Sequence, residues 1–270
     1  MVIDFHTHIF PDKIATRTLE ALIANVLEVE GIEHKSHTNG MLSGIKDSMS
    51  ENGVDMSVVL PIATTVRQST SINSFAAEIN GKDNIFSFGS VHPMQEDWEA
   101  VLEHIKELGL LGIKLHPEYQ QFFIDSPDGI KILKKCEELG LYVILHAGRD
   151  IGIRPPVHCE PRQLSNALQY VSGKNIIAAH MGGWRMWDDV EKYLVGTDVI
   201  FDTAYSVFEM DSEQLVRIIK NHGSEKIVFG TDSPWEKPSE TIAKINSLPL
   251  TDTEKDNIFC QNAKNILNLN

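Results

Sequence analysis

The chain has 270 residues, of which 42% are hydrophobic, and its formal net charge is −14 at pH 7. This length suits one (β/α)8 barrel, which takes ~250 residues, or two small domains. The acidic balance disfavours nucleic-acid and membrane-surface partners, because like charges repel, and leaves a small-molecule substrate as the expected partner.

Short apolar segments alternate along the chain with amphipathic segments, which is the pattern of βα units. Eight strands are predicted, at Val2–His6, Met56–Pro61, Ile85–Val91, Leu111–His116, Leu141–His146, Asn175–His180, Asp198–Asp202 and Lys226–Thr231. Helices are predicted at Ser69–Asn80, Gln95–Leu108, Pro127–Leu139, Glu160–Val171, Trp187–Leu194, Asp211–Asn221, Ser239–Ser247 and about Thr251–Leu267.

The segment from Lys13 to Gly53 does not fit this repeat. It is predicted to form a helix at Lys13–Glu28, a polar link that contains His34 and His37, and a second helix at Met41–Asn52. We interpret it as a helical insertion after the first strand, placed where it could partly cover a site at the strand ends.

Eight βα units can close into a barrel or form an open doubly wound sheet. A nucleotide-binding open sheet would need a glycine-rich loop after the first strand, but His6–Pro11 contains no glycine. The sequence therefore predicts an α/β fold, a (β/α)8 TIM barrel, as a single domain over residues 1–270.

The cysteines and the N-terminus bear on the compartment. Cys136, Cys159 and Cys260 form no CxxC pair, which argues against a disulfide framework and a cysteine zinc site. No signal peptide and no apolar segment of membrane-spanning length are recognised. We expect a cytoplasmic protein, and a homodimer is compatible with these features.

Histidines gather where the predicted strands end. Six of the eleven histidines lie at or next to such an end: His6, His8, His92, His116, His146 and His180. Asp232 follows the eighth strand in the same way. Active sites of barrels are built at this rim, so the pattern predicts a functional site there.

The spacing of the first pair sharpens this prediction. Alternate side chains of a strand share a face, so His6 and His8 can reach one ion, with Asp4 one layer below as a partner that orients a ligand. Two imidazoles, a third from His146 and a carboxylate from Asp232 suit one divalent ion, Zn²⁺ above all.

These residues resemble the amidohydrolase superfamily. Four segments, Ile3–Pro11, Gly112–Pro117, Ala179–Gly183 and Phe229–Trp235, resemble the amidohydrolase-related group that includes aminocarboxymuconate-semialdehyde decarboxylase. The resemblance extends from Val2 to about Asn268.

The resemblance implies roles for the matched positions. His6, His8 and His146 would ligate one metal ion, Asp232 would ligate it or hold the attacking water, and His180 would be the nearby acid/base residue. Asp232 and His180 are thus the expected catalytic residues.

Further residues near the rim are candidates for binding substrate. His116, Arg149, His158 and Trp184 are expected to contact it, with Arg149 able to pair with a carboxylate in two hydrogen bonds. Lys114 shares a face with His116 and is either a buried, paired lysine or, as in some superfamily members, a carboxylated metal bridge. The remaining histidines are interpreted as surface residues: His34, His37, His104 and His222.

Three functions follow from these residues. The first is a metal-dependent hydrolase of a small amide, ester or lactone, in which Asp232 and His180 orient a metal-activated water and move its proton. The alternative within enzymes is a non-oxidative decarboxylase of a small unsaturated or aromatic carboxylic acid. A non-catalytic metal-binding barrel is the alternative from another class.

Overall fold

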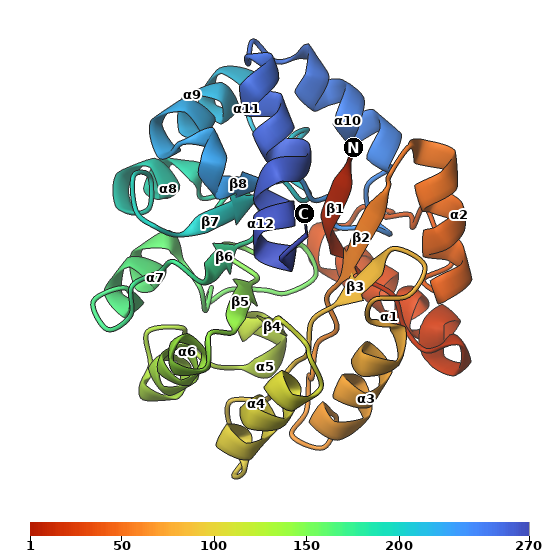
Figure 1. Cartoon of the computed structure of the whole chain (residues 1–270), viewed down its shortest axis with the longest axis vertical. Coiled ribbons are helices and arrows are strands. Elements are labelled where there is room, and N and C mark those ends of the chain that lie inside the picture. Colours follow the sequence, from red (N-terminus) through yellow and green to blue (C-terminus); the bar gives the residue numbers. More distant parts are fainter. Residues whose placement is uncertain (270) are drawn as a thin grey trace.

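The computed structural model describes residues 1–269. Within them the strands are short and buried (Figure 1): β1 (Ile3–Thr7), β2 (Met56–Val59), β3 (Ile85–Ser87), β4 (Gly112–Leu115), β5 (Tyr142–Leu145), β6 (Ile176–Ala178), β7 (Ile200–Asp202) and β8 (Ile227–Val228). All paired strands run parallel, in the orders β1-β2-β3 and β4-β5-β6-β7-β8.

Backbone hydrogen bonds join these two sheets on both sides. Between β3 and β4, the Lys114 N–H donates to the Gly89 carbonyl at 2.8 Å. Between β8 and β1, the Phe5 N–H donates to the Phe229 carbonyl at 2.8 Å. The sheet is therefore a closed, eight-stranded parallel barrel, which confirms the predicted fold class.

Helices surround the barrel (Figure 1): α1 (Asp12–Glu30), α2 (Leu42–Asn52), α3 (Ser69–Ile79), α4 (Trp98–Glu107), α5 (Pro117–Gln120), α6 (Pro127–Leu139), α7 (Pro161–Ala167), α8 (Trp187–Tyr193), α9 (Ser212–His222), α10 (Pro238–Ser247), α11 (Asp252–Asp256) and α12 (Asn262–Leu267), with the short turns η1 (Ser224–Lys226) and η2 (Asn257–Gln261). Their starts follow local chemistry, since the Ser126 and Asp211 side chains accept from backbone N–H groups in the first turns of α6 and α9. None of the described helices is long and apolar enough to cross a bilayer.

The C-terminal helix differs from its prediction as one continuous element. It is interrupted by η2, a π-helical turn. The Ile258 carbonyl in this turn accepts from the Phe229 N–H at 2.8 Å, and Asn262 Nδ2 donates to the Ile227 carbonyl at 2.7 Å. Docking onto the end of β8 thus supplies partners that a regular helix would not, and the turn widens to reach them.

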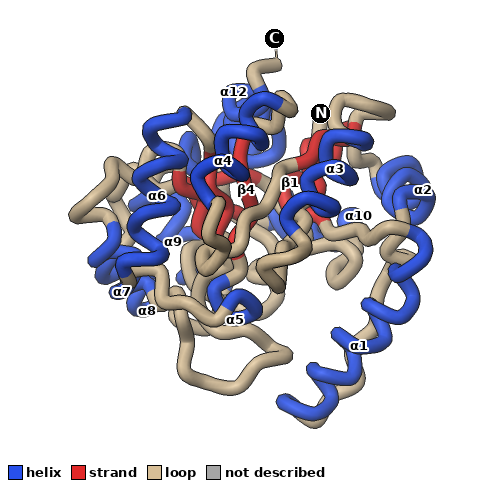
Figure 2. The backbone as a smooth tube through the Cα atoms, turned by 90° about the horizontal axis from the view of Figure 1, so that it is seen from below, coloured by secondary structure: helices blue, strands red, loops and turns tan. Residues whose placement is uncertain are grey.

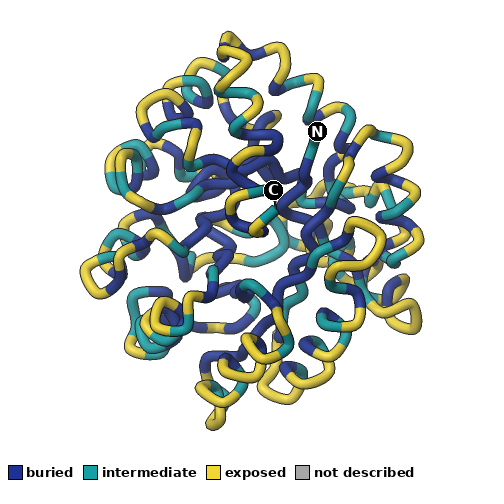
Figure 3. Tube along the Cα trace, in the orientation of Figure 1, coloured by how far each residue is buried: buried dark blue, intermediate teal, exposed yellow. Residues whose placement is uncertain are grey.

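The core fills the barrel and the space between its strands and the surrounding helices, and the insertion after β1 forms an outer structure. The strands are coloured dark blue in Figure 3, which marks buried residues, and Phe5, Phe88 and Phe201 are fully buried. Figure 2 shows α1 standing off from the barrel on the side that also carries α5, which directly follows β4. The predicted insertion therefore lies beside the carboxyl ends of the strands.

Candidate metal centre

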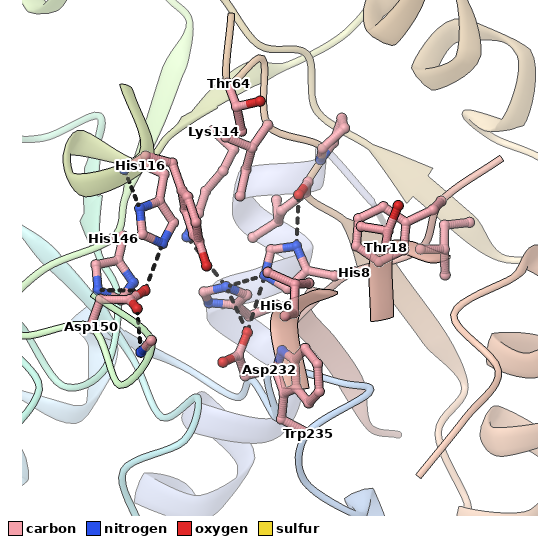
Figure 4. A pocket seen from close by; sticks show the side chains of 18 of the residues that line it. His6, His8, Thr18, Thr64, Lys114, His116, His146, Asp150, Asp232 and Trp235 are labelled. Carbon is pink, nitrogen blue, oxygen red and sulfur yellow. Dashed lines mark hydrogen bonds and ion pairs between the residues drawn. The ribbon is translucent and has the colours of Figure 1, made fainter. Parts of the chain in front are cut away.

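A cavity of about 380 Å³ opens at the carboxyl ends of the strands. Its inner end is polar and is shown in Figure 4. It is lined there by the ends of six strands and by the loop after β5, through His6, His8, Lys114, His116, His146, Asp150, His180, Tyr205 and Asp232. Most of the predicted strand-end residues therefore face one space, as the barrel rule requires.

The first group of possible ligands joins β1 to the turn after β8. His6 Nε2 lies 3.1 Å from His8 Nε2, and Asp232 Oδ1 lies 3.4 Å from His6 Nε2 and 3.1 Å from His8 Nε2. These three atoms have the spacing of ligands to one cation. The backbone φ angles of Asp232 (57°) and His180 (60°) are both positive. Non-glycine residues rarely adopt this left-handed conformation, and those that do are often found at functional sites.

Hydrogen bonds decide which imidazole nitrogens carry a lone pair in this group. His6 Nδ1 lies 2.7 Å from Asp202 Oδ2, and His8 Nδ1 lies 2.8 Å from the Leu60 carbonyl. Both partners are acceptors, so each Nδ1 is the donor. With the proton on Nδ1, His6 and His8 direct their Nε2 atoms toward each other and toward an aspartate oxygen, an arrangement that a cation would stabilise.

His146 and His180 repeat this pattern beside the first group. His146 Nε2 lies 3.1 Å from the Arg149 carbonyl, and His180 Nδ1 lies 2.9 Å from the Ala204 carbonyl. The other two nitrogens, His146 Nδ1 and His180 Nε2, face each other at 3.0 Å. Since each ring donates to a carbonyl on its far side, lone pairs meet here as well.

Burial keeps these rings neutral. It lowers the pKa of His6 and of His146 well below the usual value, and it lowers the pKa of His180 to about 4. Burial would raise the pKa of Asp232, but the contact with His8 and the charge of Lys114 hold that pKa below its usual value. At neutral pH the centre therefore combines the anionic carboxylate of Asp232 with the uncharged rings of His6, His146 and His180.

Lys114 is fully buried against this group. Its Nζ lies 3.3 Å from His6 Nε2. Burial lowers the pKa of Lys114 to about 8, against the opposing charges of Asp202 and Asp232. Both predicted alternatives place Lys114 at the site, where it contacts His6.

A second group has ligand spacing of its own and consists of His116, His146 and Asp150. His116 Nε2 lies 3.2 Å and His146 Nε2 lies 3.8 Å from Asp150 Oδ2, and the two rings stack at 4.1 Å. The structure therefore places His146 with this group, not with the other three predicted ligands. His180 lies between the groups, with ring centroids 5.2 Å from His6 and 4.7 Å from His146.

Three of the four residues predicted to contact substrate line the cavity, and the fourth does not. His116, Arg149 and Trp184 line the cavity, Arg149 with an exposed side chain and Trp184 buried. His158 is not among the residues that line it, and its backbone N–H donates to Glu118 at 2.7 Å. Its ring packs against Phe123, with centroids 4.6 Å apart.

The prediction of four surface histidines is wrong for His222 and incomplete for His34. His222 is buried, stacks on Phe201 at 4.0 Å and donates to the Val199 carbonyl at 2.7 Å. Its position in the same helical stripe as Leu215 and Ile219 was the available signal. His34 is half-buried and lines the cavity.

Sequence reasoning missed two carboxylates that shape the site. Asp202 ends the seventh strand, where an acidic residue was the signal for a ligand partner, but no role was given to it. Asp150 follows His146 closely, and only the fold shows that His116 meets it. Asp4, expected to orient a metal ligand, accepts from the Thr231 hydroxyl at 2.5 Å and from the His6 backbone N–H at 3.3 Å.

The donor set fits a divalent cation. His6, His8 and Asp232 supply two imidazoles and one carboxylate. The far nitrogen of each ring is tied to an acceptor, which matches the ligand chemistry and the outer hydrogen bonds of metal sites in proteins. The conclusion rests on the facing Nε2 atoms of His6 and His8, whose ring protons lie on the far Nδ1 atoms.

Comparisons with known proteins agree with the fold. The model of a family described as amidohydrolase matches residues 3–269. No curated protein matches the chain in sequence.

Solved structures of similar fold include enzymes of two kinds. The chain is similar to 5-carboxyvanillate decarboxylase from Sphingomonas paucimobilis, with 17% identity, 100% of this chain and 99% of that chain covered, and a TM-score of 0.70. It is similar to a 2,6-dihydroxybenzoate decarboxylase, with 14% identity, 99% of each chain covered and a TM-score of 0.69. It is also similar to a probable 2-pyrone-4,6-dicarboxylic acid hydrolase from Acinetobacter baumannii, with 15% identity, 99% of each chain covered and a TM-score of 0.65. At these identities the likeness concerns the fold.

Proposed function

The chain belongs to the amidohydrolase family, and we propose that it is a metal-dependent, non-oxidative decarboxylase of a small aromatic or unsaturated carboxylic acid. The observation that supports this proposal is the group of imidazole nitrogens and a carboxylate with ligand spacing at the inner end of the cavity. The other walls of that cavity are largely apolar. The two solved decarboxylases of the same fold support the choice of reaction.

We assign the ion to His6, His8 and Asp232, which share ligand spacing, and add His146 from the second group as the fourth proposed ligand. Zn²⁺ is the first ion to test. His146 Nδ1 is included because its lone pair faces His180, next to His6. A bound divalent ion would act as a Lewis acid that polarises substrate oxygen atoms and stabilises negative charge. Asp202 and the Leu60 carbonyl keep His6 and His8 in the tautomer that binding requires.

The chain's own residues would bind the substrate and move the proton. Arg149 lies at the cavity wall with an exposed guanidinium and can pair with an incoming carboxylate. The bond between the carboxyl carbon and its neighbour breaks, the electron pair stays on the neighbour, and CO₂ leaves. One proton taken up from solvent is passed to that carbon by Asp232 and His180, which balances the loss of CO₂, and apolar walls limit access of competing water.

Lactone hydrolysis is the second candidate function, because a probable pyrone hydrolase shares the fold. The same Asp232 and His180 would then orient a water and take its proton. This was the first expectation from the sequence, and the apolar cavity and the solved decarboxylases favour its alternative.

Isotopes separate the two reactions. Zinc- and manganese-loaded protein is given 2,6-dihydroxybenzoate, 5-carboxyvanillate and 2-pyrone-4,6-dicarboxylate, once in D₂O and once in H₂¹⁸O. The proposal expects CO₂ release and one deuterium on the carbon that carried the carboxylate. Incorporation of ¹⁸O into a ring-opened acid without CO₂ release would replace it with hydrolysis, and tight metal binding without any turnover would count against both.

A further inference from the structure

The cavity continues away from the metal centre along one face of α1. Ile14, Thr18, Leu22 and Val26 line it, and their spacing of four residues places them on a single stripe of the helix. The insertion after β1 thus contributes a wall of the cavity, not only a cover.

The facing wall comes from α3 and from the segment after β2. Ile72 and Phe75 of α3 line the same cavity, as does Ile62, which follows β2. We call the space between these walls the outer groove and define it by six residues: Ile14, Leu22, Val26, Ile62, Ile72 and Phe75.

The outer groove is chemically unlike the inner end. The six residues that define it are apolar, and the polar residues on the same walls, Thr18, Thr64, Gln68 and Ser71, are uncharged. The inner end, in contrast, carries the imidazoles, Asp150 and Asp232. Figure 4 shows Thr18, from the middle of the α1 stripe, on the side of His8 away from His146. The polar and apolar parts of one cavity therefore lie at opposite ends.

The groove's apolar side chains remain partly open to solvent. Ile14 is 40% exposed, and Leu22, Ile72 and Phe75 are only half-buried. Apolar surface of this kind gains free energy when a ligand covers it. The wall is also held in place, because Arg185 pairs with Glu30 at the end of α1 at 3.3 Å.

We infer that the outer groove is a subsite for an apolar extension of the substrate, so that the substrate is an acid with a polar reacting end and an alkyl or aryl tail. The inference rests on the proposed function only in placing the carboxylate at the inner end. Continuity of the groove with the metal centre in one cavity is the argument for this occupant.

Binding of graded probes tests this subsite without any turnover. Zinc-loaded protein is titrated calorimetrically with benzoate, 4-ethylbenzoate and 4-butylbenzoate. Each buried methylene strengthens binding about fourfold at most. We expect 4-butylbenzoate to bind roughly tenfold to a hundredfold more tightly than benzoate.

Variants of the groove and a matched control test whether the outer groove is the source of the tighter binding of 4-butylbenzoate. Leu22→Trp fills the groove and should abolish the preference for 4-butylbenzoate while benzoate still binds. Ala24→Trp adds the same indole to the exposed, opposite face of α1 and should preserve the preference. Ile72→Trp fills the groove from the other wall and replaces Leu22→Trp if that variant does not fold.

Equal affinities of the wild type for the three acids, or no binding of any of them, would overturn the subsite. So would an undiminished preference in the folded Leu22→Trp or Ile72→Trp protein. Failure of the proposed decarboxylation has a different signature, because probe binding and its chain-length dependence would persist without CO₂ release from any acid.

Discussion

Asp202 Oδ2 lies 2.7 Å from His6 Nδ1, while Asp202 Oδ1 accepts from the backbone N–H of His180 at 2.8 Å. One carboxylate at the end of β7 thus fixes a proposed ligand from β1 and the start of the turn that carries His180. Burial raises the pKa of Asp202, and Lys114 and the His180 N–H oppose this by favouring the ionised form. The tautomer of His6 depends on this contact.

Asp202→Asn should weaken metal binding by ~10–100-fold, the usual effect of losing such an outer partner. The N–H groups of His180 and Ala204 require the amide oxygen at the Oδ1 position, which turns the amide NH₂ toward His6 Nδ1. His6 must then carry its proton on Nε2, where the ion would bind. Zinc affinity is measured by competition with a chelator.

Asp198→Asn is the matched control, since Asp198 is exposed just before β7. It should keep the wild-type affinity. An unchanged affinity in Asp202→Asn would show that the contact does not set the His6 tautomer.

His146 and His180 face each other, but we assign them different roles. His146→Gln should lose most of its bound zinc, because it removes a ligand. His180→Gln should retain zinc and lose ~10²–10⁴-fold in turnover, the range for a residue that transfers a proton. Metal content by atomic emission and CO₂ release distinguish the two. Zinc loss in His180→Gln with full zinc in His146→Gln would exchange the assignments.

Glu236 should make the protein less stable as pH rises. It is buried, and burial together with the charge of Asp232 raises its pKa to about 8 from 4.5. Between these values the folded state keeps a proton that the unfolded state releases, so stability falls with increasing pH by up to ~1.4 kcal/mol per unit. Below about pH 4.5 both states are protonated and the loss is absent.

Glu236→Gln removes this dependence because the amide does not titrate. In guanidinium denaturation, its stability relative to the wild type should be greater at pH 8 than at pH 5. Glu240→Gln, at an exposed position of α10, should show the same difference from the wild type at both pH values. A constant difference for Glu236→Gln would indicate that Glu236 is already ionised at pH 5.

Gly148 joins the turn after β5 to the turn after β6. Its φ is +83°, and an added Cβ would lie 2.2 Å from the Trp184 backbone nitrogen. Gly196 has a φ of +85° with open space around it. Both alanine variants therefore pay the left-handed strain of ~1–2 kcal/mol, but only Gly148→Ala also clashes with backbone.

Urea denaturation should show Gly148→Ala as the less stable variant by at least ~2 kcal/mol. Its zinc affinity should fall too, because the turn carries the Arg149 carbonyl that holds His146. Similar stabilities for the two variants would mean that the two turns can separate at little cost.

The position of the site was largely predictable from the sequence, whereas its partnerships were not. The order of strands and the histidines at their ends follow from local patterns. The tie between His6 and Asp202 joins residues 196 positions apart. No spacing rule covers that distance, and the same is true of the meeting of His116 with Asp150, which depends on how two loops fold over one rim.

The sequence by itself determined the barrel and the rim, because strand periodicity and chain order fix which side chains face inward and at which end. The tertiary structure decided the rest. Hydrogen bonds between distant segments determine which nitrogen of His6 and of His8 bears a lone pair. The tertiary fold also brings His146 next to Asp150 and places α1 opposite α3 along the cavity. The physical reason is that these hydrogen bonds and cavity walls join segments that are far apart along the chain. Local sequence patterns do not show which distant segments come together in space.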